Sequence, residues 1–364
     1  MRSDSRINNK KFCFNSIKFF ASMIFFWICT ILYLFYEIEI KNHSLIGISR
    51  SKRTTMKIEK VFSNIDVISD NYGSKFDVLK YHKRISRINF IFKLYFKRCV
   101  DDYRMLRKFI INSELKKYKN TILNNLSIRI PHTIYYEFFV EEIIKRYKNN
   151  IIISGQMYDR FAEIEYSISK KYGKKLIVIP HGVETSKEMP VAYSGDVFYC
   201  TSEVMKNQLN KLYNTEKFRY NSCILQKMYS LNSEKISDKK VVFFTQPGID
   251  DVCLSLIEEI NKNLSKHGIE LLIKIHPLET KEKYRRLNLK TIDNFEEAIC
   301  NSICISLFST ILLEAIYNNS VPISIIHLIG INELKDDYFF LENKKILKPT
   351  TMDELINNIY NNKR

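Results

Sequence analysis

The stretch VVFFTQPGIDDVCLSLIEEINKNLSKHGIELLIKIHP, residues 241–277, carries the clearest fold signal in the chain. It opens with a short apolar run at 241–245, continues through an amphipathic segment at 252–267 that Gly268 ends, and closes with an apolar run at 270–275. Short apolar runs bounded by turn residues are typical of buried strands, and the 3.6-residue period between them is typical of a helix. The pattern predicts strand, helix and strand in alternation, as in a parallel α/β sheet.

The same alternation continues on both sides of this stretch. Further strands are predicted at 150–154, 175–180, 196–200, 303–307 and 321–326, and further helices at 158–172, 202–213 and 310–317. The unit formed by residues 150–180 has the β-α-β order that implies parallel strands with a right-handed crossover. We therefore predict an α/β fold with two doubly wound, Rossmann-like domains facing a cleft, one at 61–200 and one at 201–364.

Composition indicates a globular protein with a basic surface. The 364 residues are 45% hydrophobic and carry a formal net charge of +17. The chain is rich in Lys, Asn, Ile and Tyr, and this bias indicates an AT-rich gene in which Lys accumulates without a functional cause. No nucleic-acid-binding motif is present, so nucleic acid is not an expected partner. A basic surface favours anionic partners such as phospholipid head groups, nucleotide phosphates or acidic glycans.

The N-terminal region predicts a membrane anchor. Residues 1–18 form a basic tail, and FFASMIFFWICTILYLFY at 19–36 (Phe19 to Tyr36) is uncharged over 18 residues, a length that just reaches across a bilayer. Five Lys or Arg lie close to each end of this run, so the positive-inside rule does not decide its orientation. A polar linker is expected at 37–60. The alternative is a buried or misannotated extension, with Met56 as the start of the protein.

A basic, aromatic-rich stretch at 78–109 allows two interpretations. One is the solvated face of amphipathic helices. The other is a patch that contacts an anionic membrane or an acidic acceptor.

Four polar clusters follow directly after predicted strands. They are Pro180–Glu184 (PHGVE), Thr245–Gly248 (TQPG), Lys274–Pro277 (KIHP) and Ser306–Thr310 (SLFST), the last with Glu314 four residues on. In doubly wound sheets, ligands bind beyond the carboxyl ends of the strands. The clusters are therefore expected to line a binding site.

The residue types in these clusters suit a phosphate-bearing ligand. Ser309 and Thr310 would open a helix whose N-terminal N–H groups and dipole favour an anion. His276 could donate to a phosphate oxygen or a leaving group, and Glu314 could accept from ribose hydroxyls. Gly182 would let backbone approach the ligand closely. Each residue alone also has a structural explanation, as a turn or an N-cap, and only the shared order and placement favour function.

In their order along the chain, the clusters HG, TQP, KxHP and SxxSTxxxEA resemble bacterial surface-polysaccharide glycosyltransferases of the GT-B fold. Within that group the likeness is to the sialyltransferase and polysialyltransferase type, and the sequence is also similar to CDP-glycerol glycerophosphotransferases. The resemblance covers about residues 151–325. It implies that the domain at 61–200 is the acceptor side and that the domain at 201–364 binds a nucleotide sugar.

The resemblance also assigns roles to single residues. It implies that His276 contacts the donor phosphate and assists departure of the nucleotide. The donor-binding set is Gly182, Thr245, Gln246, Lys274, Pro277, Ser306, Ser309, Thr310 and Glu314. The sialyltransferase type carries an acidic pair before Gly that supplies the general base, and this chain has Pro180-His181-Gly182 instead. The candidate bases are His181 first, then Glu184, Asp159 and Glu163.

No metal or cofactor is expected. The chain contains no Asp-x-Asp motif, which a metal-bridged diphosphate site would need, and no Cys/His cluster with zinc spacing. Fixed dipoles, hydroxyls and His276 would instead neutralise the leaving phosphate.

Three hypotheses for function follow. The first is an inverting, metal-independent glycosyltransferase that moves a sugar, such as sialic acid or a related acidic sugar, from a CMP-linked donor to an oligosaccharide or glycolipid acceptor at the membrane. The second is a polyol-phosphate transferase that uses CDP-glycerol. The third is a non-catalytic, membrane-anchored protein that binds glycan or nucleotide.

Overall fold

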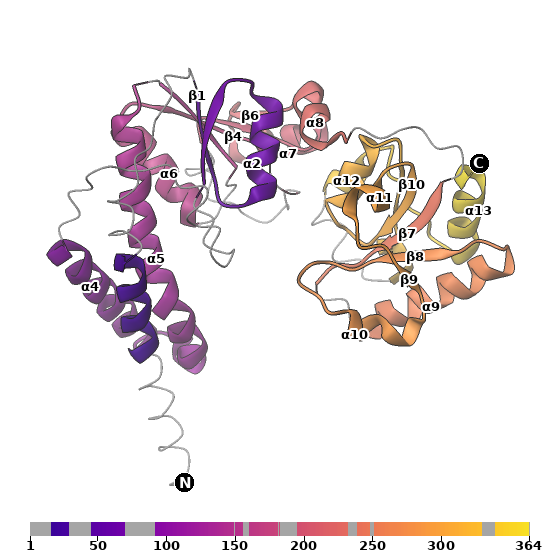
Figure 1. Ribbon diagram of the computed structural model, residues 1–364, viewed down its shortest axis with the longest axis horizontal. Helices are drawn as coiled ribbons and strands as arrows, with labels where there is room; N and C mark the ends of the chain where they lie inside the picture. The colour runs from indigo at the N-terminus through magenta and orange to yellow at the C-terminus, as the bar shows by residue number, and fades with distance from the viewer. Residues whose placement is uncertain are drawn as a thin grey trace, which may run out of the picture. The chain divides into compact units, whose positions relative to one another are not determined.

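A computed structural model describes residues 16–28, 45–69, 92–148, 150–155, 160–180, 182, 195–231, 239–247, 251–329 and 339–363. The chain divides into two compact units, residues 1–179 with 190–197 and residues 180–189 with 198–364. Each unit is built on a parallel sheet with helices against it (Figure 1). The expected α/β class with parallel sheets is confirmed, and the division at 197–198 lies three residues before the predicted boundary.

The first sheet has six strands in the order β2-β1-β3-β4-β5-β6. They are β1 Leu45–Ser49, β2 Ile65–Ser69, β3 Ile151–Ser154, β4 Lys175–Val178, β5 Val197–Tyr199 and β6 Phe218–Arg219. Helix α6 (Arg160–Lys171) connects β3 to its parallel neighbour β4, which confirms the predicted β-α-β unit. Strands β5 and β6 pair within this first sheet, although most of their residues belong to the second unit.

The linker expected at 37–60 is wrong for its described part. Strand β1 lies inside the first sheet, where it pairs with both β2 and β3, and helix α2 (Lys52–Val61) follows it. The Ser51 side chain caps α2 by accepting from the backbone N–H of Thr54 at 3.1 Å. The strand is only five residues long and basic residues follow it closely, so its apolar signal is hidden in the sequence. A variant starting at Met56 would lack this strand.

A helical bundle extends from the first sheet. It contains α4 (Phe92–Ile111), the short 3-10 helix η1 (Glu114–Tyr118), α5 (Lys119–Arg146) and a helix over residues 16–28. Figure 1 shows the 16–28 helix in indigo beside α4 and α5. Phe19, Met23 and Phe26 are buried in its shared core with α4 and α5.

The predicted anchor at 19–36 lies partly in this bundle, and residues 29–36 fall outside the described part of the chain. Among the described helices, none has the length and apolar character needed to cross a bilayer.

The second sheet has the order β11-β10-β7-β8-β9. Its strands are β7 Lys240–Phe244, β8 Leu271–Lys274, β9 Lys290–Thr291, β10 Ser302–Ser306 and β11 Val321–Ser324. The helices of this unit are α7 Glu203–Tyr213, α8 Ser222–Tyr229, α9 Asp251–Lys266, α10 Lys281–Tyr284, α11 Phe295–Ile299, α12 Ile311–Ile316 and α13 Met352–Lys363. Short 3-10 helices lie at Arg285–Leu287, Ile326–Ile329 and Phe339–Glu342. Every strand and helix predicted between 240 and 326 is present, within two residues at each end.

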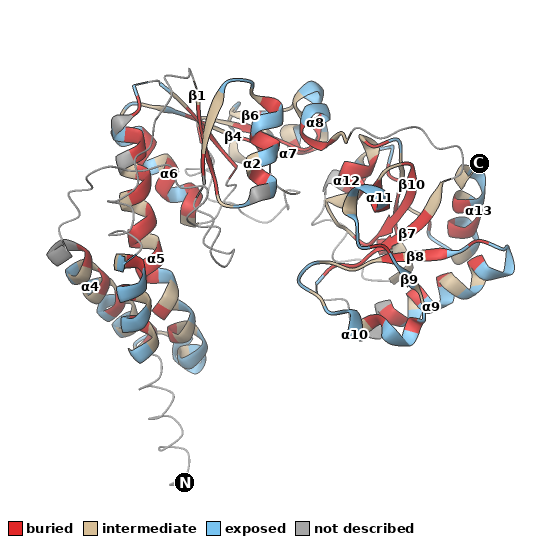
Figure 2. Cartoon of the chain, in the orientation of Figure 1, coloured by how far each residue is buried: buried red, intermediate tan, exposed pale blue. Residues whose placement is uncertain are grey.

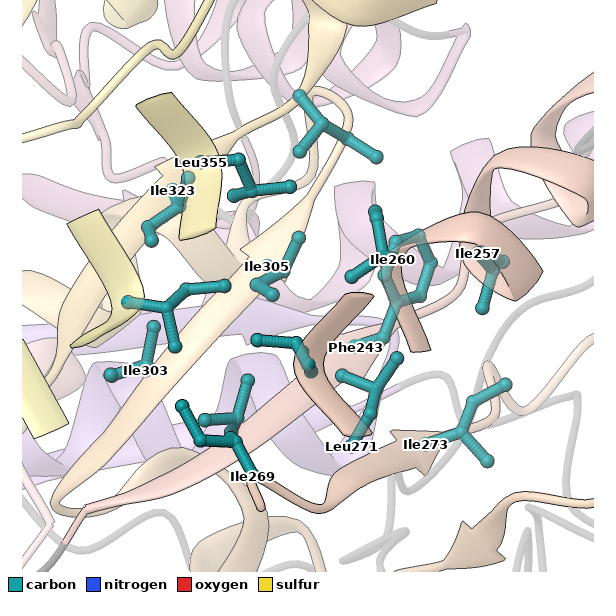
Figure 3. Close-up of a cluster of buried hydrophobic side chains, with 14 of the residues drawn as sticks. Phe243, Ile257, Ile260, Ile269, Leu271, Ile273, Ile303, Ile305, Ile323 and Leu355 are labelled. Carbon is teal, nitrogen blue, oxygen red and sulfur yellow. The ribbon is translucent and has the colours of Figure 1, made fainter. Parts of the chain in front are cut away.

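Both faces of the second sheet are covered, as the burial colours in Figure 2 show. Phe243 points to one face, where it packs with residues of α9 and α13 such as Ile257, Ile260 and Leu355 (Figure 3). Val242 belongs to a separate cluster that includes residues of α11 and α12. Because successive strand residues point to opposite faces, a strand covered on both sides must be apolar throughout. This explains the continuous run of apolar residues in β7.

Candidate functional site

The carboxyl ends of β7, β8 and β10 meet at one edge of the second sheet. β7 pairs in parallel with β8 on one side and with β10 on the other. The residues after each strand are joined by hydrogen bonds, from Thr245 N to the Lys274 carbonyl at 3.1 Å and from Phe308 N to Gln246 Oε1 at 3.4 Å. The structure thus brings three of the four predicted clusters together.

The buried side chain of Thr245 holds the loop that carries His276. Thr245 is 3% exposed. The hydroxyl accepts a hydrogen bond from His276 N at 2.9 Å and donates to Glu279 Oε2 at 2.7 Å. A buried hydroxyl that both donates and accepts is satisfied within the protein. Thr245 therefore positions the loop after β8 rather than offering its hydroxyl to a ligand.

The loop itself is a tight turn that sets the orientation of the His276 ring. The backbone N–H of Glu279 donates to the His276 carbonyl at 2.9 Å, which places Pro277 at the second position of the turn, where its fixed φ is suitable. The Leu278 N–H donates to His276 Nδ1 at 3.1 Å. A ring nitrogen that accepts carries no proton, so the proton of the neutral ring lies on Nε2. His276 is half-buried and can present Nε2–H as a donor.

Glu279 was not among the predicted residues, and it is the anchor of this network. Its side chain is 6% exposed, and it accepts hydrogen bonds from Thr245, from Lys283 Nζ at 2.8 Å and from the Tyr284 hydroxyl at 2.8 Å. Burial by itself raises the pKa of Glu279. The three hydrogen bonds, that from Lys283 first, lower the pKa by more than burial raises it, so the pKa lies below its ordinary value. The carboxylate is therefore charged at neutral pH and holds the loop in place.

The remaining residues of the edge are placed in different ways. Ser306 is fully buried, and its hydroxyl donates to the Phe244 carbonyl at 3.0 Å, so it supports the edge from within the sheet. Lys274 donates from Nζ to the Asp293 carbonyl at 2.7 Å. Pro277 is exposed.

Two hydroxyls stand at the β10 end of the edge. Ser309 and Thr310 are half-buried and precede α12, and Ser309 Oγ accepts from Ile311 N at 3.4 Å. Thr310 makes no side-chain capping bond to α12. A methyl group added to Gly182 would lie 3.7 Å from Thr310 Oγ1. Glu314 is 4% exposed within α12, and its backbone carbonyl accepts from Asn318 at 2.7 Å.

Most of the predicted general bases lie outside the part of the chain that the structure describes. His181, Glu184 and Asp159 lie outside the described residues. Glu163 lies exposed on α6 in the first unit. Gly182 is the one described residue of the HG motif, and residues 180–189 belong to the second unit together with Thr310.

Comparison with known proteins identifies the fold. No protein-family model matches the sequence, and no curated protein matches it. Among solved structures, a putative UDP-N-acetylglucosamine 2-epimerase from Listeria monocytogenes superposes with a TM-score of 0.53 at 10% identity, covering 89% of this chain and 88% of that one. The UDP-N-acetylglucosamine 2-epimerase from Rickettsia bellii gives 0.51 at 11% identity, covering 88% and 87%. The S. aureus MnaA–UDP co-structure gives 0.50 at 10% identity, covering 87% and 86%.

These likenesses extend over both units of the chain and share with it the two-sheet α/β architecture of the GT-B fold. At identities of 10–11% they show the fold. Function is carried by the residues at the site.

Proposed function

We propose that this chain is a glycosyltransferase that binds a nucleotide-activated sugar at the β7–β8–β10 edge. The observation that carries the proposal is the fixed His276 ring, whose Nδ1 accepts from Leu278 N and whose loop is tied to the buried Thr245 and Glu279. A ring held this way offers one directed donor, Nε2–H, with little conformational freedom left to lose on binding. The UDP in the fold neighbour from S. aureus supports a nucleotide ligand.

The chemistry of His276 follows from its tautomer. In the proposed reaction an acceptor hydroxyl attacks the anomeric carbon, the bond from that carbon to the phosphate oxygen breaks, and the nucleotide leaves with the bonding electrons. Negative charge grows on the phosphate as that bond breaks, so a donor aimed at it binds the transition state more strongly than the ground state. Protonating Nδ1 would break the bond from Leu278 N. His276 therefore acts as a neutral hydrogen-bond donor rather than as a general acid.

The other residues of the edge have supporting roles in this proposal. Ser309 and Thr310 donate their hydroxyls to the same phosphate, and Gly182 leaves room for it beside Thr310. Gln246 and Glu314 hold the nucleoside. His181 is the proposed base that accepts the proton of the acceptor hydroxyl, with Glu184 as the alternative.

For the donor we propose a CMP-linked sugar, sialic acid or a related acidic sugar, transferred with inversion and without a metal to a glycan at the membrane. The sequence resemblance to sialyltransferases supports this choice, and the basic composition suits acidic substrates.

A nucleotide-sugar panel tests the proposal. The full chain is incubated with CMP-, UDP- and CDP-linked donors, and mass spectrometry measures the released nucleotide and the fate of the sugar. Release of CMP from CMP-sialic acid, slowed about 10- to 100-fold in His276→Ala and unchanged in His267→Ala, is the expected result. His267 is a suitable control because it is exposed just after α9 and precedes the N-terminal end of β8, whereas the His276 loop follows the C-terminal end of that strand. Turnover of CDP-glycerol alone, epimerisation of a UDP sugar, or no turnover with any donor would refute the assignment.

A further inference from the structure

The helix at 16–28 has two apolar faces, and the protein covers one of them. Phe19, Met23 and Phe26 are 1–4% exposed against α4 and α5. The opposite face consists of Ile17, Phe20, Ala21, Ile24, Phe25 and Ile28. Its five large side chains are 45–65% exposed, and every exposed residue of this helix is apolar. Single exposed apolar side chains are normal, but a contiguous stripe marks a surface that contacts something apolar.

The ring contacts of this helix fix its direction in the bundle. Phe19 stacks on Tyr103 with ring centroids 4.3 Å apart, and Trp27 meets Phe96 edge-on at 6.0 Å. The helix therefore runs antiparallel to α4. Its first turn, which carries Ile17, lies towards the C-terminal end of α4, where η1 begins the return into α5.

The bundle tip at that end is also apolar and basic. Four large side chains are 41–62% exposed there, Met105, Phe109, Leu115 and Tyr118. Residues 104–119, which form this end of the bundle, contain six Lys or Arg against one Glu, a net charge of +5. Three of the cations line a hollow of about 250 Å³ together with Ile111 and Asn112; these are Arg104, Arg107 and Lys108. We call this set, with the exposed stripe of the 16–28 helix, the tip surface.

We propose that the tip surface docks onto an anionic phospholipid bilayer. The apolar stripe and the tip side chains enter the interfacial layer, and the surrounding Lys and Arg contact lipid phosphates. Apolar residues on one face with cations beside them are the combination that binds interfacial helices to anionic membranes. A second copy of the chain is a poorer partner, because two surfaces with this charge repel each other. Because its other face is buried on α4 and α5, the 16–28 helix docks as part of the bundle.

Vesicle flotation with the full chain tests the apolar part of the proposal. The protein is mixed with preformed vesicles of phosphatidylcholine, alone or with an equal amount of phosphatidylglycerol. The expected result is binding to the anionic vesicles that an alkaline carbonate wash reverses. The double variant Phe20→Glu/Ile24→Glu should reduce this partitioning by about 100-fold, because each change replaces inserted apolar surface with a charge that the lipid repels.

The matched control is Leu212→Glu/Tyr360→Glu, which changes two apolar residues of similar exposure, 57% and 48%, on α7 and α13. It should bind vesicles as the wild type does. Thermal melting of each variant establishes that it is folded, which is expected because all four side chains are exposed.

The basic part is tested by Lys116→Ser and Lys117→Ser, singly and together, since both residues are exposed on η1. Each lysine removed should weaken binding to anionic vesicles about fivefold, equivalent to about 1 kcal/mol, and raised salt should do the same. Vesicle binding unchanged in the folded Phe20→Glu/Ile24→Glu variant would overturn the proposal. Retention after the carbonate wash or equal binding to both vesicle types would overturn the proposal as well. A third contrary result is a wild-type dimer in ultracentrifugation that Phe20→Glu/Ile24→Glu converts to a monomer, with neither protein binding vesicles.

Discussion

Replacing His276 by alanine is the most informative perturbation of the proposed site. In the proposed function the variant loses a hydrogen bond from Nε2–H to a charged phosphate, and such bonds contribute about 1.5–3 kcal/mol. If the bond strengthens only as charge develops on the leaving nucleotide, the loss falls on turnover, which should drop by about 10- to 100-fold. The Kd for the free nucleotide should change less than turnover.

The same substitution has a small, separate cost in stability. His276→Ala also removes the acceptor for Leu278 N, a neutral bond that contributes about 0.5–1.5 kcal/mol at a half-buried position. The backbone bond to Thr245 and the Glu279 turn remain, so the melting temperature should fall by only about 2–4 °C. A folded but slow enzyme is therefore expected.

The assay measures nucleotide release, nucleotide affinity by calorimetry and thermal melting on one preparation each of wild type, His276→Ala, His276→Gln and His267→Ala. Glutamine keeps an N–H donor but cannot act as an acid, so it should recover part of the lost turnover if His276 is a neutral donor. Full turnover in His276→Ala would remove this residue from the mechanism. A glutamine variant as slow as the alanine variant would refute the tautomer argument, and a melting temperature lowered by much more than 4 °C would make the residue structural.

Other predictions concern the support of the site and the first sheet. Because the pKa of Glu279 is lowered from 4.5, the stability that the wild type has over Glu279→Gln should be fully present at pH 7 and decline as the pH falls below 4.5, measured by melting in a pH series. Thr245→Val removes the hydrogen-bond partner of His276 N and one of the three partners of the Glu279 carboxylate, so it should lower stability by about 1–3 kcal/mol and slow turnover. The control Thr350→Val removes a hydrogen bond to Glu354 at an exposed site, so it should lower stability by less and leave turnover unchanged. Denaturant unfolding and the release assay check both. Deleting residues 1–55 removes β1 from between β2 and β3, so circular dichroism should show loss of the first unit, and a folded product would contradict the pairing.

The positions of the strands of the second sheet were readable in advance where a strand is buried on both faces. Residues 241–244 are apolar without interruption because Phe243 and Val242 face different cores, and this makes β7 stand out in the sequence. Parallel pairing then places all strand ends at one edge, so the meeting of Gln246, His276 and Phe308 followed from the order of elements alone.

One local pattern failed because its signal was short, and another is shared between two kinds of structure. Strand β1 is five residues long in a basic stretch and was assigned to a linker. The apolar run beginning at Phe19 predicts a spanning helix, but hydropathy does not distinguish lipid from protein as the neighbour of each face. Only the packing of Phe19, Met23 and Phe26 on α4 and α5 separates the covered face from the exposed one.

The amino-acid sequence by itself determined the alternation of strands and helices and the cluster of polar residues at the strand ends, because both depend on local periodicity and on the direction of parallel strands. Tertiary structure alone decided what each polar residue does there. Ser306 looked like a ligand contact and is buried in the sheet, whereas Glu279 belongs to no motif and holds the His276 loop. The proton position on His276 depends on one hydrogen bond from Leu278 N, which exists only once the turn has formed.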